Sequence, residues 1–205
     1  MEPITRRTAL ALLAAAPAAG ALSWTDAEAR EAFEQSTGAR HAAARAKTAY
    51  KPKFFTAAEY AMVVTLVDLI IPKDERSGSA TDAGVPEFID FLMVDQPARQ
   101  IAMRGGLARI DQICNERFDR NFMACSATER TQVLDDLAFA GNALAKPELS
   151  QAVAFFNGLR DLTATGFWTS RIGIQDLQYT GNVYVENWTG CPEAALKKLG
   201  VNYGE

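Results

Sequence analysis

Hydrophobic residues between positions 53 and 165 recur at the three- and four-residue spacing of buried helical faces. The clearest run follows Thr56, which can form a capping box with Glu59, and it ends at Pro72. Its apolar face comprises Tyr60, Val63, Val64, Val67, Ile70 and Ile71. Further runs predict helices near residues 85–92, 98–122, 127–141 and 149–165. We therefore expect an all-α fold of about five helices.

Local signals mark the starts and interruptions of these helices. Pro86 stands in the first turn of the second helix, where proline is well tolerated. Ser126 and Glu129 have the spacing of another capping box and predict the start of the fourth. The Gly105-Gly106 pair could bend the run over residues 98–122.

The segments on either side of this helical region lack a clear period. Residues 22–52 are rich in Ala, Glu and Arg, which predicts a weak helix or a solvated lead-in segment. This segment carries His41, the single histidine, and such a lone histidine is more typical of a surface position than of a metal ligand. Beyond Gly166 we expect an irregular, aromatic-rich C-terminal segment. Its aromatic side chains could fill the core or face a partner protein.

The N-terminus has the three parts of a cleaved export signal. Arg6 and Arg7 precede an alanine-rich apolar stretch that ends at the small residues Ala19-Gly20-Ala21. The adjacent arginines predict the twin-arginine type, although they could also be the positive charges of a general secretory signal. The chain thus divides into a signal (residues 1–21), a lead-in (residues 22–52) and a single helical domain (residues 53–205).

Composition and motifs argue against catalysis or nucleic-acid binding by this chain. The net charge of −4 leaves no basic field for a phosphate backbone, so we expect no nucleic-acid partner. The chain contains no GxGxxG, P-loop, CxxC, HExxH or GxSxG motif, and one histidine is too few for most metal-hydrolase schemes. We therefore expect no catalytic residue, no metal site and no cofactor in this chain.

Two carboxylate pairs are the remaining candidates for acid–base chemistry. They are Asp68 with Asp74, and Asp90 with Asp95. Their positions on helices and in a loop favour helix caps and solvated charges instead.

The three cysteines leave the disulfide pattern open. Cys114 and Cys125 could pair if they lie on neighbouring elements, which would leave Cys191 free to bond a partner. Alternatively, all three are reduced and at least two are buried as small apolar residues.

Several blocks of the sequence resemble the gluconate 2-dehydrogenase subunit 3 family. The first blocks are Phe54-Phe55-Thr56-x-x-Glu59, Ile70-Ile71-Pro72-x-Asp74 and Ala80-x-x-Ala83-Gly84-Val85-Pro86-x-Phe88-Ile89-Asp90. The later blocks are Phe155-Phe156-x-x-Leu159-Arg160-x-Leu162-Thr163, Gly166-Phe167-Trp168-Thr169-Ser170-x-x-Gly173 and Tyr179-x-Gly181-Asn182. The resemblance covers about residues 53–192. A twin-arginine-like leader before these blocks is also typical of the family.

The resemblance implies a non-catalytic small subunit of a periplasmic, membrane-associated dehydrogenase. In such complexes a large flavoprotein of the glucose-methanol-choline type holds FAD and oxidises a sugar, sugar acid or alcohol, and a cytochrome c subunit with haem accepts the electrons. The small subunit carries the export signal and supports folding, export and stability of the flavoprotein. The competing hypothesis is an independent exported helical enzyme or ligand-binding protein.

A subunit of this kind needs a docking surface for its partner. The candidates are Trp168, Tyr179, Tyr184 and Trp188 for the partner interface, with Cys191 for an inter-chain disulfide. For the aromatic residues the alternative is that they fill the core.

Overall fold

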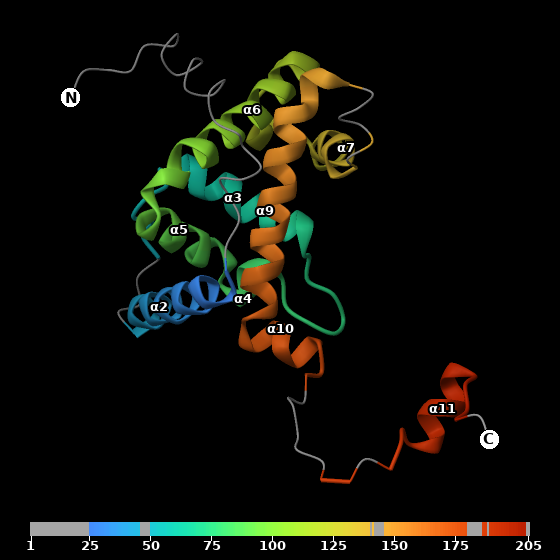
Figure 1. Cartoon of the computed structure of the whole chain (residues 1–205). Coiled ribbons are helices and arrows are strands. Elements are labelled where there is room, and N and C mark those ends of the chain that lie inside the picture. The colour runs from blue at the N-terminus through green and yellow to red at the C-terminus, as the bar shows by residue number, and fades with distance from the viewer. Residues whose placement is uncertain are drawn as a thin grey trace.

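The computed structural model shows a helical protein (Figure 1). It describes residues 25–45, 50–139, 141, 146–179, 186–187 and 189–203. Within these residues all regular structure is helical and no strand occurs, which confirms the all-α fold. No helix in the described part is long and apolar enough to span a membrane.

The described α-helices are α2 (Asp26–Arg45), α3 (Ala57–Ile70), α4 (Ala80–Ala83), α5 (Val85–Asp95), α6 (Gln100–Phe118), α7 (Ala127–Ala138), α9 (Ser150–Trp168), α10 (Arg171–Asp176) and α11 (Glu193–Leu199). Three short 3₁₀ turns separate some of them: η2 (Pro97–Arg99), η3 (Phe122–Ala124) and η4 (Pro147–Leu149). The five predicted helices correspond to α3, α5, α6, α7 and α9.

Helix α9 lies at the centre of the helical body, and α3, α5, α6 and α7 surround it (Figure 1). It also contacts α4 and α10. Its apolar side chains, including the fully buried Leu159 and the almost fully buried Phe155, belong to one continuous hydrophobic cluster with residues of the surrounding helices. Burial of these side chains is the main stabilising contribution to the fold.

Helix α3 starts where the sequence predicts, but its buried face is rotated from the predicted one. Thr56 and Glu59 form the capping box. The helix buries Met62, Val63, Leu66 and Val67, whereas four of the six predicted face residues, including Tyr60 and Ile70, are only partly buried. The helix is apolar on most of its circumference, so the sequence pattern alone does not select the face.

Helix α6 runs without interruption through Gly105-Gly106. Gly106 serves close packing instead, because a β-carbon there would overlap the Phe155 ring of α9. Ile101, assigned from the pattern to the buried face, is half exposed at the start of the helix.

Residues 26–45 form helix α2, for which the sequence left a weak helix and a solvated segment open. The helix packs against α5 and buries Ala32 and Ser36. Phe33 lies beside Phe88 of α5, with 6.3 Å between the ring centroids. Tertiary contact therefore contributes to the stability of a helix whose sequence is mostly polar.

The expectation of an irregular chain after Gly166 was wrong for residues 167–168, 171–176 and 193–199, which are helical, whereas the other described residues beyond Gly166 lie outside helices. Helix α9 continues through Gly166 to Trp168, and α10 and α11 follow. Gly166 lies inside the helix, and the Phe88 ring occupies the space where a β-carbon would be, so the position favours glycine. Here glycine allows two elements to approach closely and does not end the helix.

Asp90 in α5 is a fully buried carboxylate that holds the segment before α3. Its Oδ2 accepts hydrogen bonds from the Tyr50 hydroxyl at 2.9 Å and from the Lys53 amide at 2.8 Å. Its Oδ1 accepts from the Phe54 and Phe55 amides at 3.0 and 3.1 Å. The four donors compensate the cost of burying the carboxylate. Asp90 is therefore a structural anchor and not the solvated charge that its pattern favoured.

We expect Asp90→Ala to lower the free energy of unfolding by about 3–5 kcal/mol, because it leaves three backbone amides and a tyrosine hydroxyl without their acceptor. Asp95→Ala is the matched control on the same helix, since Asp95 is exposed, and it should change stability by less than about 0.5 kcal/mol. Urea denaturation followed by circular dichroism measures both. Equal stability of the two variants would contradict the anchoring role.

Candidate partner-docking face

The turn between α9 and α10 is built by the Gly-Phe-Trp-x-Ser-x-x-Gly block. The Ser170 hydroxyl donates to the Phe167 carbonyl at 2.6 Å and accepts from the Gly173 amide at 3.0 Å, which caps α10. Gly173 lies so close to Phe167 that a β-carbon would overlap the Phe167 carbonyl oxygen. The block thus specifies a tight corner between two helices.

This corner orients neighbouring aromatic residues in opposite directions. Phe167 is buried in the core, while Trp168 is 41% exposed. The two rings meet edge to face, with centroids 5.0 Å apart and planes at 87°. Trp168 therefore packs against a buried core residue on one side and is exposed to solvent on the other.

Four large hydrophobic side chains are exposed between the end of α9 and the residues that follow α10. They are Trp168, Ile174, Leu177 and Tyr179, of which Leu177 and Tyr179 are more than half exposed. We call these four residues the α10 face. A cluster of large hydrophobic side chains on one short stretch is typical of a protein interaction surface.

The position of α10 is fixed by the loop that follows α3. The Arg76 guanidinium donates to the Asp176 carbonyl at 3.0 Å and forms an ion pair with the Asp176 carboxylate at 3.3 Å. The loop is itself ordered by Asp74, whose Oδ1 accepts from the amides of Ser77 and Arg76, both at 2.8 Å. These backbone hydrogen bonds lower the pKa of Asp74. The Ile-Pro-x-Asp block therefore acts on α10 through the loop.

The predicted interface residues are only partly within the described structure. Trp168 and Tyr179 lie near the two ends of α10, and both are exposed. Tyr184 and Trp188 lie outside the described residues, as do Arg6 and Arg7 of the export signal. Cys191 is exposed, and its amide donates to the Tyr203 hydroxyl at 2.5 Å.

Two residues of the α10 face were missed by sequence reasoning. Ile174 and Leu177 lie three positions apart, which is the spacing of one helical face. The helix has only six residues, so the period was too short to recognise. The capping position of Ser170 was the signal that could have identified it.

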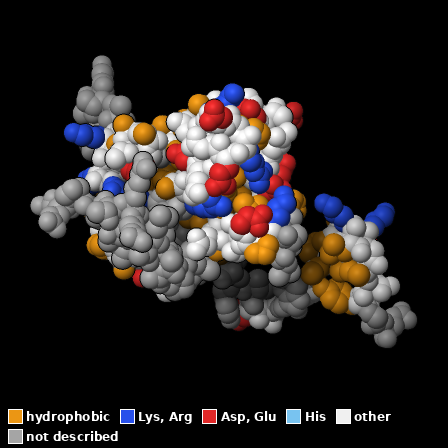
Figure 2. Space-filling model, turned by 90° about the horizontal axis from the view of Figure 1, so that it is seen from above, with side chains coloured by type: hydrophobic (Ala, Val, Ile, Leu, Met, Phe, Trp, Pro, Cys, Tyr) orange, Lys and Arg blue, Asp and Glu red, His pale blue; other side chains and the backbone are white. Residues whose placement is uncertain are grey.

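The C-terminal helix α11 lies apart from the helical body (Figure 1) and has no buried residue. Figure 2 shows a hydrophobic patch on the lobe that this segment forms, with basic side chains beside it. Leu199, Val201 and Tyr203 are its most exposed large hydrophobic side chains.

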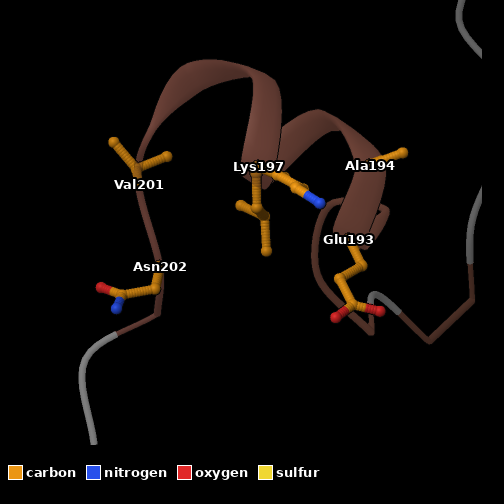
Figure 3. Close-up of a pocket in the computed structure, with 6 residues that line it drawn as sticks. Glu193, Ala194, Lys197, Val201 and Asn202 are labelled. Carbon is orange, nitrogen blue, oxygen red and sulfur yellow. The ribbon is translucent and has the colours of Figure 1, made fainter.

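A hollow on this lobe does not suggest a catalytic site. Its lining residues all come from the C-terminal segment and are Glu193, Ala194, Leu196, Lys197, Val201 and Asn202 (Figure 3). They include one carboxylate and one ammonium group, with no paired acid and base and no nucleophile beside a base.

Several ionisable residues lie around Asp90. Glu87 is buried and forms an ion pair with Arg40 at 3.7 Å. Burial, with further contributions from Glu87 and Asp90, raises the pKa of Tyr60 and of Tyr50. Both tyrosines therefore stay protonated near neutral pH, and Tyr50 uses its proton to bind Asp90. This cluster stabilises the fold.

The other acidic candidates have structural partners or lie on the surface. Asp68 accepts from the Thr81 amide at 2.8 Å and so holds the start of α4, while Asp74 orders the loop after α3. Asp95 is exposed. The backbone of His41 lies in α2. In the described residues no three His, Cys, Asp or Glu side chains form a cluster that could hold a metal ion.

These features define a small helical protein whose most distinctive surface is apolar. The chain belongs to the gluconate 2-dehydrogenase subunit 3 family, because the model of that family matches residues 57–190, well over half of its length. No curated protein and no solved structure matched the chain. Membership in this family makes the chain an accessory subunit of a multi-subunit dehydrogenase complex.

We expect Gly173→Ala to lower the free energy of unfolding by about 1–3 kcal/mol, because the added methyl group collides with the Phe167 carbonyl and opens the corner. Gln175→Ala is the control on the same helix. Its side chain is exposed, so the change should stay within about 0.5 kcal/mol. Thermal and urea unfolding measure the difference, and a Gly173→Ala protein as stable as the control would refute the steric argument.

Proposed function

We propose that this chain is the non-catalytic small subunit of a periplasmic, membrane-associated dehydrogenase. It carries a twin-arginine export signal and binds a large FAD-containing flavoprotein of the glucose-methanol-choline type, which oxidises a sugar, sugar acid or alcohol. A cytochrome c subunit with haem accepts the electrons. The small subunit assists folding, export and stability of the flavoprotein. The observation that carries this proposal is the family match over residues 57–190.

The leader supports the proposed division of labour. Arg6 and Arg7 stand directly before a mild apolar stretch, and a twin-arginine signal serves proteins that are already folded. A flavoprotein without a leader of its own can then cross the membrane bound to this chain. The flavin and the haem belong to the other subunits, and the expectation that this chain holds no cofactor remains a prediction.

The α10 face is the surface that we assign to the flavoprotein. Its four side chains are large and hydrophobic, and Trp168 rests on the buried Phe167. A tryptophan fixed in this way loses little conformational freedom on binding, which favours strong interface contacts. The Arg76–Asp176 ion pair and the hydrogen bond from Arg76 to the Asp176 carbonyl link the end of α10 to the loop after α3.

The first test changes the α10 face without disturbing the core. We expect Trp168→Ala and Tyr179→Ala each to weaken binding of the flavoprotein at least about tenfold, because they remove aromatic contacts at the proposed interface. Affinity capture of the small subunit at a series of dilutions, with bound flavin read by absorbance, measures this change.

Phe139→Ala is the matched control for this test. Phe139 is an aromatic residue that is 66% exposed, and it caps the end of α7, a helix that lies away from α10 (Figure 1). It should leave binding within about twofold. Trp168 and Tyr179 variants that retain flavoprotein as well as the Phe139 variant would count against this interface, and substrate turnover by the isolated small chain would refute the non-catalytic role.

The second test concerns export. We expect the double change Arg6→Lys and Arg7→Lys to retain both subunits in the cytoplasm, since it removes the arginine pair but keeps both positive charges. A general secretory signal needs only the charge, so it would still function. Fractionation followed by dehydrogenase assay distinguishes the two routes, and undiminished periplasmic activity would contradict twin-arginine export.

A further inference from the structure

The described residues after position 188 fold into a small lobe around α11, which we call the C-terminal lobe (residues 189–203). The Tyr203 hydroxyl accepts a hydrogen bond from the Cys191 amide at 2.5 Å. The Tyr203 ring also packs over Gly190, where a β-carbon would lie 2.9 Å from it. Gly190 has a φ of +98°, a conformation that favours glycine. These contacts hold the two ends of the lobe together.

The C-terminal lobe leaves its large apolar side chains uncovered. Leu199, Val201 and Tyr203 are 72%, 55% and 59% exposed, and α11 has no buried residue. They stand within one short stretch, whereas an ordinary surface carries single scattered hydrophobic residues. A helix of 7 residues is too short to be stable in water by itself. The lobe therefore needs a further surface that covers its apolar side.

The α10 face alone is small for a permanent subunit interface. From their exposed fractions, its four side chains can bury at most about 500 Å². Obligate interfaces bury more than about 1,000 Å² on each partner, of which about two thirds is apolar. The three exposed side chains of the C-terminal lobe can bury about 400 Å² more. The two surfaces together reach the apolar area that a permanent interface needs.

We propose that the C-terminal lobe is a second contact surface for the flavoprotein, which this chain binds at the α10 face and at the lobe together. The inference rests on the proposed function, because a flavoprotein that crosses the membrane bound to this chain needs a permanent interface. Tyr179 of the α10 face and Thr189 of the lobe are joined by a stretch of chain that spans up to about 35 Å when extended. One large partner can therefore contact both surfaces.

Two linked contacts predict slow dissociation of the complex. Once the α10 face is bound, the lobe meets its site as an intramolecular partner at a high effective concentration. The complex then separates only when both contacts are open at the same time. Loss of the lobe contact should therefore act mainly on the dissociation rate and much less on the association rate.

The first measurement compares two double variants of the whole chain, each produced together with the flavoprotein. Leu199→Ala with Val201→Ala should raise the dissociation rate at least about tenfold, because it removes apolar contacts of the lobe. Val94→Ala with Ile101→Ala is the matched control. These aliphatic residues are 41% and 51% exposed but lie on α5 and α6, so the rate should stay within about twofold. Release of flavoprotein from the immobilised small subunit, followed by flavin absorbance, gives both rates.

The second measurement is hydrogen exchange of the wild-type chain, which needs no substitution. In the isolated chain the amides of residues 193–203 should exchange at least about tenfold faster than in the complex, because only the complex covers the lobe.

Two results would overturn the inference while leaving the proposed function intact. One is a lobe variant that releases the flavoprotein as slowly as the control variant. The other is equal protection of the lobe with and without the flavoprotein, which would mean that the lobe is covered by its own chain or by nothing. A wild-type chain that retains no flavoprotein would instead contradict the proposed function, and the inference with it.

Discussion

The attachment of the chain before α3 to the helical core depends on one fully buried carboxylate. Asp90 sits inside the core and accepts hydrogen bonds from three consecutive backbone amides and one tyrosine hydroxyl, which attaches the chain before α3 to α5. Arg104 of α6 reinforces the same segment by donating to the Phe54 carbonyl at 2.9 Å and stacking over its ring. A buried carboxylate is costly unless its oxygens accept hydrogen bonds, so Asp90 and its four donors stabilise one another. Together with Arg104, they link the start of α3 to α5 and α6.

From this anchor the packing proceeds to α9 and then to the surface. Gly106 of α6 accommodates the Phe155 ring of α9, and Gly166 of α9 accommodates the Phe88 ring of α5. The tight corner at Ser170 follows the end of α9, where Phe167 is buried and Trp168 is exposed. The exposure of Trp168 is therefore decided by how α9 packs against its neighbours.

This organisation fits a subunit that works by binding. The sequence blocks that resemble the family contain helix caps, a turn and close helix contacts. The distinctive exposed feature is the α10 face. The proposed partner contact and the Asp90 anchor lie in different parts of the chain, so recognition and stability can be altered separately.

The sequence by itself determined the class of fold, the starts of α3 and α7, and the family, because capping boxes and apolar periods depend on residues only a few positions apart. Tertiary structure decided which face of α3 is buried, that α2 packs as a helix, and that Asp90 is an anchor rather than a solvated charge. It also decided that Gly166 lies within a helix and that Cys114 and Cys125 are both buried while Cys191 is exposed. Each of these outcomes depends on contacts between residues distant in sequence, or between whole elements, and no local pattern encodes them.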